Sequence, residues 1–273
     1  MSGYQVCHLR SVVCGLSPIH LQTGMKEQTI LYQDLGFLSY KEAWNYQERL
    51  MRQNLDIKSN ALQNAESPHY TQRSFAGQPT TNYLLFVEHP PVYTLGKSGK
   101  QEHVLLNEEE RKLRGIEFFK INRGGDITFH GPGQLVGYPI LDLENFFTDI
   151  GRYLRSLEEV IIRTLEEYGL KGERSKGETG VWIDPGVKGK ERKICAMGVR
   201  CSRWITMHGF AFNVSTDLSY FDGIIPCGIQ HKQVTSLNKE LGAVEPIDRV
   251  KEKLIRNFEA VFTARIIEAP VVF

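Results

Sequence analysis

The sequence predicts an α+β fold in which helices flank a mixed β-sheet. Many short apolar runs of strand length end at Gly or Pro, whereas two or three longer segments repeat their apolar residues at helical spacing. These strands and helices do not alternate strictly, as they would in a fold built from βαβ units. A length of 273 residues allows one large domain or two small ones. Because no linker forces a division, we expect a single domain over residues 29–273, with the end beyond Val244 as a candidate small lobe.

Composition excludes several classes of protein. Lys and Arg number 33 against 32 Asp and Glu, so the net charge of +1 gives no basic surplus for nucleic-acid binding. The hydrophobic fraction of 41% supplies a core, yet no run reaches the roughly 18 apolar residues of a membrane span. Five cysteines, an odd number without CxxC spacing, favour a reducing compartment. We therefore expect a cytoplasmic protein with no membrane or nucleic-acid partner, and a monomer as its default state.

Residues 1–28 are expected to form a disordered tail or an overextended start. Met1 to Gly24 contain no Asp or Glu and a single Arg, and they lack the continuous apolar stretch of a secretory signal. An organelle transit segment would carry more Arg, and Met25 is an alternative initiator.

Apolar patterning places the elements along the rest of the chain. Strands are expected at 30–36, 84–87, 92–95, 116–121, 135–143, 181–183, 193–199, 210–214 and 266–267. Helices are expected from Tyr40, after a capping pair formed by Ser39 and Glu42, and at 107–114, 150–168 and 250–262. Polar residues 56–78 predict a long surface loop or insertion, and residues 184–192 an exposed hairpin tip.

A glycine-rich segment runs from Arg123 to Gln134. Its glycines let the backbone approach a ligand closely, and polar side chains accompany them at Arg123, Thr128, His130 and Gln134. The segment matches neither a phosphate loop nor the GxGxxG pattern. It is therefore either a ligand-binding loop or a glycine turn between strands that holds a satisfied histidine.

Lys193 begins a strand that is otherwise apolar. In a partly dry pocket the pKa of its amine would be tunable. Lys193 could equally be the end of the basic hairpin tip. Residues 208–214 place small residues beside aromatic ones. That composition suits a groove for an acyl chain and suits an ordinary strand equally well.

Cys227 stands between Pro226 and Gly228, and a cysteine fixed on a tight turn is a candidate nucleophile. Most cysteines are instead small buried apolar groups, but Cys195 and Cys201 lie in or beside a strand, which leaves Cys227 as the best candidate. The eight histidines show no pair with the spacing of a helical zinc site, so no metal is expected.

Together these segments resemble the octanoyl-[acyl-carrier-protein]:protein octanoyltransferase family, also called lipoate–protein ligase B. Four motifs in the same order carry the resemblance: Arg-Gly-Gly-x-x-Thr-Phe-His-Gly-Pro-Gly-Gln at 123–134, Arg-Lys-Ile at 192–194, His-Gly-Phe-Ala-Phe-Asn at 208–213 and Pro-Cys-Gly-Ile at 226–229. The similarity extends from about Leu31 to the C-terminal helix. The first residues and the polar segment 56–78 depart from the family pattern, which puts the domain boundaries in doubt.

The resemblance implies a fold similar to the catalytic domain of biotin and lipoate ligases, and an acyltransferase without a cofactor. It implies octanoyl acyl carrier protein as the donor, and lysines of 2-oxoacid dehydrogenase lipoyl domains and of the glycine-cleavage H protein as acceptors. Cys227 corresponds to the acyl-accepting cysteine and Lys193 to its partner lysine. The implied substrate-binding residues are Arg123, Gly124, Gly125, Asp126, Ile127, Thr128, Phe129, His130, Ala196, Met197, Gly198, Gly209, Phe210 and Ala211.

Two other functions remain open at this point. An ATP-dependent lipoate or biotin ligase would share the fold but would need adenylate-binding residues and no nucleophilic cysteine. A non-catalytic docking module for carrier domains would never carry a covalent acyl group. Cys227 together with Lys193 favours the transferase.

Overall fold

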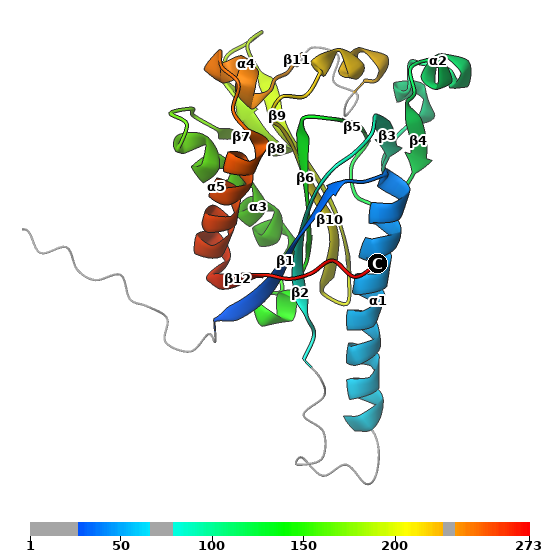
Figure 1. Ribbon diagram of the computed structural model, residues 1–273, viewed down its shortest axis with the longest axis vertical. Coiled ribbons are helices and arrows are strands. Elements are labelled where there is room, and N and C mark those ends of the chain that lie inside the picture. The colour runs from blue at the N-terminus through cyan, green and yellow to red at the C-terminus, as the bar shows by residue number, and fades with distance from the viewer. Residues whose placement is uncertain (1–26, 66–78, 226–232) are drawn as a thin grey trace, which may run out of the picture.

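The computed structural model describes residues 27–65, 79–225 and 233–273. A large mixed sheet forms its centre (Figure 1). In spatial order its strands are β12 (Ala264–Glu268), β1 (Gln28–Phe37), β2 (Asn82–Glu88), β6 (Gln134–Ile140), β10 (Ile205–Asn213), β9 (Arg192–Ser202), β8 (Glu178–Ile183) and β7 (Glu173–Ser175), with β11 (Gln233–Val234) paired to β9. Strands β12, β1 and β2 run parallel, β11 runs parallel to β9, and the other pairs are antiparallel. The expected mixed sheet is confirmed.

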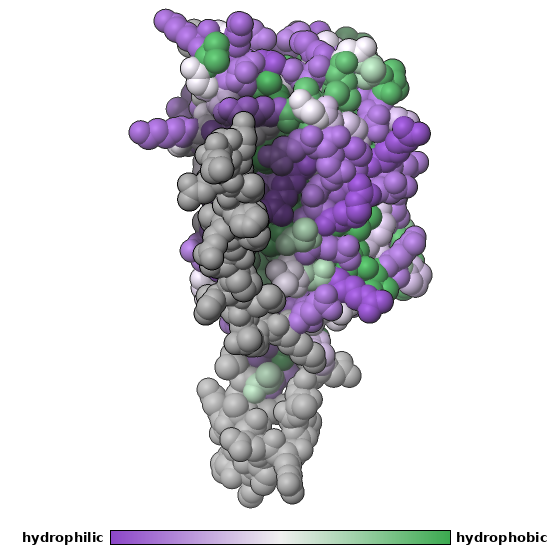
Figure 2. Space-filling model, turned by 90° about the vertical axis from the view of Figure 1, so that its left-hand side faces the viewer, coloured by the Kyte–Doolittle hydropathy of each residue, from purple (hydrophilic) through white to green (hydrophobic). Residues whose placement is uncertain are grey.

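Helices cover both faces of this sheet. On one face lie α3 (Ile150–Glu166) and α5 (Ile247–Phe262), and on the other lies α1 (Tyr40–Ala65) (Figure 1). Figure 2 looks onto the side of α3 and α5, where hydrophilic side chains predominate among the coloured residues. Because α5 packs against α3 and β12 pairs with β1, the end beyond Val244 belongs to the main core and is not a separate lobe.

A second, three-stranded sheet stands beside the first helical turn of α1 (Figure 1). Its central strand β3 (Val92–Leu95) pairs with β4 (Glu117–Lys120) and β5 (Ile127–His130). The short elements η1 (Gln101–His103), α2 (Glu108–Leu113) and η3 (Leu218–Gly223) accompany it. Further short elements are η2 (Leu143–Asn145) and α4 (Leu237–Leu241).

Local sequence signals explain where the helices begin. Ser39 caps α1, because its hydroxyl accepts the N–H of Glu42 at 3.3 Å. The Asp149 carboxylate caps α3 in the same way by accepting the N–H of Arg152 at 2.9 Å. The predicted apolar stripe of α3 is confirmed, since its members Tyr153, Leu157, Val160, Ile161 and Leu165 have no exposed surface.

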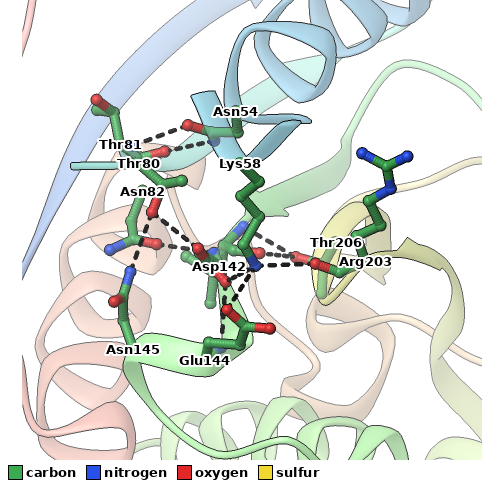
Figure 3. A network of polar contacts seen from close by, with 11 residues as sticks. Asn54, Lys58, Thr80, Thr81, Asn82, Asp142, Glu144, Asn145, Arg203 and Thr206 are labelled. Carbon is green, nitrogen blue, oxygen red and sulfur yellow. Dashed lines mark hydrogen bonds and ion pairs between the residues drawn. The ribbon is translucent and has the colours of Figure 1, made fainter. Parts of the chain in front are cut away.

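The expected loop at 56–78 is wrong for its first part. Helix α1 continues through residues 56–65, while 66–78 lie outside the described residues. Polar contacts of Asn54 and Lys58 anchor this part of α1 (Figure 3). Asn54 exchanges two hydrogen bonds with the backbone of Thr81, at 2.8 and 2.9 Å. Lys58 reaches Asp142 at 2.7 Å and the carbonyl oxygen of Arg203 at 2.9 Å.

Asp142 is the centre of that polar network (Figure 3). Its carboxylate is almost buried, with 4% of the side chain exposed, and it also accepts the Thr80 hydroxyl at 2.9 Å. Its backbone N–H donates to the Asn82 side chain at 2.9 Å. One acidic residue therefore connects α1, the strand β2 and the end of β6.

Removing the Asp142 carboxylate should destabilise the fold. In Asp142→Ala the Lys58 ammonium, on a side chain that is only 14% exposed, keeps the exposed Glu144 as its ion-pair partner. We expect the free energy of unfolding to fall by about 3 kcal/mol, as for a broken buried pair, measured by denaturant titration. The matched control is Glu144→Gln, whose side chain is 53% exposed, and it should cost less than about 1 kcal/mol. Equal losses in both variants would contradict this assignment.

Candidate active site

A cavity of about 600 Å³ lies between the large sheet and the second sheet, a volume typical of small-molecule sites. Thirteen of the predicted substrate-binding residues and the predicted lysine line it: Arg123, Gly124, Gly125, Asp126, Ile127, Thr128, His130, Lys193, Ala196, Met197, Gly198, Gly209, Phe210 and Ala211. Segments distant along the chain thus meet at one cavity because β9 and β10 are neighbours and the glycine-rich segment crosses beside them.

One predicted residue that the structure describes, Phe129, is not part of this lining. Phe129 is 1% exposed and packs into the core of the second sheet, with its ring stacked on Tyr220 at 4.7 Å. Side chains alternate along a strand, and this alternation sends Phe129 away from its neighbours Thr128 and His130. Cys227 lies outside the described residues.

Glycines bring three backbone segments close together around the cavity. A Cβ at Gly209 would lie 2.2 Å from the carbonyl oxygen of Gly137, and a Cβ at Gly198 would lie 2.8 Å from that of Gly124. The N–H of Gly124 also donates to the carbonyl oxygen of Val199 at 2.9 Å, which fastens the glycine-rich segment to β9. The segment therefore forms part of the cavity wall.

Arg123 is a buried cation beside the cavity, 8% exposed. Its guanidinium donates to the carbonyl oxygen of Thr94 at 2.7 Å, to the Thr94 hydroxyl at 3.0 Å and to the carbonyl oxygen of Gly124 at 3.0 Å. These bonds orient the side chain along the second sheet.

The hydrogen bonds of His130 define its tautomer. The Gln134 amide nitrogen donates elsewhere, to Phe129 and Asn213, so its oxygen must accept from Nδ1–H of His130, at 2.8 Å. Nε2 then accepts from the Thr94 hydroxyl at 3.3 Å, and that hydroxyl oxygen itself accepts from Arg123. With both ring nitrogens engaged, His130 orients a wall and is not free to act as a general base.

A chain of side-chain hydrogen bonds continues from His130 toward Lys193. Gln134 donates to the Asn213 side chain at 2.9 Å, and Asn213 donates to the carbonyl oxygen of Thr235 at 3.0 Å. The N–H of Thr235 in turn donates to the carbonyl oxygen of Lys193 at 2.9 Å. The glycine-rich segment, β10 and the strand of Lys193 are thereby held in one polar network.

Three histidines around the cavity are buried and neutral. Burial lowers the pKa of His89 to about 4 and that of His208 to about 3, with the positive charge of Arg123 adding to the effect at His208. Burial, the neighbouring His89 and Arg123 hold the pKa of His130 well below 6.5. Within the described residues, no three His, Cys, Asp or Glu side chains form a group that could hold a metal ion.

Lys193 lies half-buried on β9 between two other strands. It is opposite Trp182 on β8 and opposite Val234 on β11. Its ammonium nitrogen lies 4.6 Å from the centroid of the Trp182 ring. The described cysteine nearest to it in sequence, Cys195, is fully buried, and burial raises the pKa of its thiol, so Cys195 is not a nucleophile.

Several lining residues escaped the sequence analysis. Tyr40 and Tyr138 come from α1 and β6, and Ile150 and Leu154 come from α3. Residues 177–179 lie at the turn before β8 and at its start. In the sequence these residues look like ordinary core or surface positions of amphipathic elements. By contrast, His208 and Asn213 belong to the motif at 208–213. Their polar side chains beside aromatic residues could have indicated that they belong to the site.

No helix in residues 27–65, 79–225 and 233–273 has both the length and the apolarity that crossing a bilayer requires.

Comparison with known proteins gives a consistent result. Residues 39–259 match the sequence profile of the lipoyl protein ligase A/B catalytic domain. A curated octanoyltransferase from Christiangramia forsetii is 59% identical over 235 residues, covering 86% of this chain and 96% of that relative. One from Flavobacterium johnsoniae is 60% identical over 240 residues, covering 87% and 98%.

Solved structures agree with the fold. A bi-partite lipoate protein ligase from Thermoplasma acidophilum superposes with a TM-score of 0.62 at 19% identity, covering 91% of this chain and 88% of that one. An ATP-bound lipoate-protein ligase A gives a TM-score of 0.61 at 17% identity, covering 91% and 90%. The chain therefore belongs to the lipoyl protein ligase A/B catalytic-domain family and, through its curated relatives, to the octanoyltransferases, a class of acyltransferase.

The buried histidines should make stability depend on pH. They stay neutral in the folded protein, whereas the unfolded chain binds protons below a pKa of about 6.5. Their contribution is thus fully present above pH 6.5 and is lost as the pH falls toward 4, at about 1.4 kcal/mol per pH unit for each histidine. Denaturant titrations between pH 7.5 and 4.5 should show this fall, and His89→Gln should remove about one third of the histidine slope. An unchanged slope in that variant would contradict the assignment.

Proposed function

We propose that this protein transfers an octanoyl group from the thioester of acyl carrier protein to a lysine of lipoyl domains or of the glycine-cleavage H protein. The observation that carries the proposal is the cavity, because it combines an apolar wall with the Lys193 amine. The relatives named octanoyltransferase support the acyl group. A solved relative described as a lipoate protein ligase with its E2 lipoyl domain supports the kind of acceptor.

The walls of the cavity suit a hydrocarbon chain. Apolar surface is presented by Val136, Leu154, Met197 and Phe210. At Gly198 and Gly209 no side chain projects, so neighbouring backbone segments pack closely together there. The polar side chains of the wall are engaged with one another, as the hydrogen bonds of His130 and Gln134 show. A chain of methylene groups can therefore replace water there without leaving those polar side chains short of hydrogen-bond partners.

Cys227 is the proposed nucleophile, and the described residues on both sides of 226–232 support that role. Phe221 and Val234 line the cavity. The N–H of Ile225 donates to the carbonyl oxygen of His103 at 2.8 Å, and the His103 ring pairs with Asp126 of the cavity wall. Val234 pairs in register with Lys193. The described residues that flank 226–232 therefore lie beside the cavity and beside the Lys193 amine.

In the first half-reaction the proposed pair is a thiolate and an ammonium. An ammonium about 4 Å from a thiolate stabilises it by at most about 4 kcal/mol at an effective dielectric near 20. That suffices to ionise a thiol whose ordinary pKa is about 8.5. The thiolate attacks the carrier thioester, its sulfur bonds to the acyl carbon as the bond from that carbon to the carrier's sulfur breaks, and the carrier leaves as a thiol with the proton of the Lys193 ammonium.

In the second half-reaction Lys193 acts as the base. Acylation has removed the negative charge that favoured its ammonium form, so the amine gives up its proton more easily beside the acyl chain. Lys193 then accepts a proton from the acceptor amine, which attacks the acyl-enzyme carbonyl and displaces the cysteine sulfur. A thioester becomes an amide, a downhill change that needs no ATP.

The acyl-enzyme is the decisive intermediate. Incubating the protein with octanoyl acyl carrier protein alone should add one octanoyl mass, and Cys227→Ser should abolish that addition because serine is a far weaker nucleophile. Intact-mass spectrometry measures both. The matched control is Cys201→Ser, a half-buried thiol at the end of β9, which should load as the native chain does. Acceptor modification that occurs only with ATP would favour a ligase, and a chain that never carries acyl mass would favour a docking module.

Lys193→Ala should separate binding from chemistry. We expect the affinity for octanoyl acyl carrier protein to change by less than about threefold, because the apolar wall remains. Both half-reactions should slow by about 10²- to 10⁴-fold, the usual contribution of a positioned acid–base group. Single-turnover loading and discharge rates measure this effect. Normal turnover in the variant would remove Lys193 from the mechanism.

A further inference from the structure

We infer that Trp182 is a positioning residue that holds the Lys193 amine in place through a cation–π contact. Its mechanistic meaning rests on the proposed function, but the contact itself can be tested without any substrate. Trp182 would act through Lys193, since it is not among the described residues that line the cavity.

The geometry arises from the sheet. Trp182 and Lys193 are opposite each other on the antiparallel strands β8 and β9, so their side chains emerge on the same face. The ammonium nitrogen lies 4.6 Å from the indole centroid, within the range of an effective cation–π contact. Trp182 is 2% exposed and therefore presents a fixed ring. Indole is the most favourable of the aromatic rings for such a contact.

Two carboxylates close to the strand of Lys193 are engaged by its neighbour Arg192. Arg192 binds Glu240 through two nitrogens, each at 2.6 Å, and Asp184 through a third contact at 2.7 Å. Among the described residues, no carboxylate forms an ion pair with Lys193. Arg192 therefore binds Glu240 and Asp184, and the indole ring of Trp182 is a described partner of the Lys193 charge.

A neutral partner has a consequence that a carboxylate would not have. A carboxylate beside Lys193 would favour the ammonium strongly in both half-reactions and would hinder proton uptake from the acceptor amine. The ring quadrupole orients the ammonium with a smaller preference for charge. The amine is therefore held at one place while it changes protonation state, which a residue serving first as cation and then as base requires.

The contact should be visible by NMR in the free protein. Protons that lie over an indole face are shifted upfield, so the Hε protons of Lys193 should resonate upfield of the other lysines, with Lys193→Arg identifying the signal. Trp182→Leu should return them to the ordinary position. Hε protons at the ordinary lysine position in the native chain would overturn the inference, whether or not the protein transfers octanoate.

Kinetics should show the positioning role. In Trp182→Leu we expect loading by octanoyl acyl carrier protein to slow by about 5- to 20-fold, because the ammonium loses a partner of cation–π strength. The pH at which discharge to the acceptor is half-maximal should move downward, because the amine loses its proton more easily. Trp182→Phe, which keeps a ring and is the milder change, should lie between these values and the native ones.

The matched control uses a second pair of the same type. Lys41 lies 4.8 Å from the Trp44 ring on α1, and Trp44→Leu should leave the pH midpoint of discharge unchanged. If the native chain loads octanoate but Trp182→Leu keeps the native loading rate and pH midpoint, Trp182 has no positioning role. A native chain that never loads would overturn the proposed function instead, and the NMR result would still decide the contact.

Discussion

The hydrogen bond between the side-chain amides of Gln134 and Asn213 is the constraint on which the site depends. The two residues face each other where β6 pairs with β10, and both are almost fully buried. Their remaining amide groups reach His130 on one side and Thr235 on the other. A buried amide that loses its partner costs free energy, so the position of each strand is tied to the next. The walls of the cavity and the strand of Lys193 are therefore fixed relative to each other before any substrate binds.

The electrostatics of the cavity follow from that burial. The histidines around it are kept neutral by desolvation, and the positive charge of Arg123 opposes their protonation further at His130 and His208. These rings act as oriented hydrogen-bonding groups in the wall. The Lys193 amine has a different environment, half-buried at the lining and set against an aromatic ring. Under the proposed function, the cavity offers apolar walls to an acyl chain and places the Lys193 amine at the same lining.

Much of the architecture was predictable because it depends on local patterns. The stripe of α3 and the cap at Ser39 act within a few residues of the chain. The second half of α1 was missed for the opposite reason: Lys58 and Asp142 are 84 residues apart, and a polar segment anchored so far away looks like a loop in the sequence. Phe129 was assigned to the site as part of a motif, whereas strand alternation sends its ring into the core of the second sheet.

The sequence by itself determined the α+β class, most of the helices and strands, the family and the residues of four motifs, because residue types and spacings record these features directly. Only the tertiary structure decided that residues from the 123–128 segment, β5, β9 and β10 line one cavity, that His130 holds a single tautomer, and that Lys193 meets Trp182. These features arise from strand order and register. Strand pairing joins residues far apart in the chain, and a pattern within one segment carries no information about its partner.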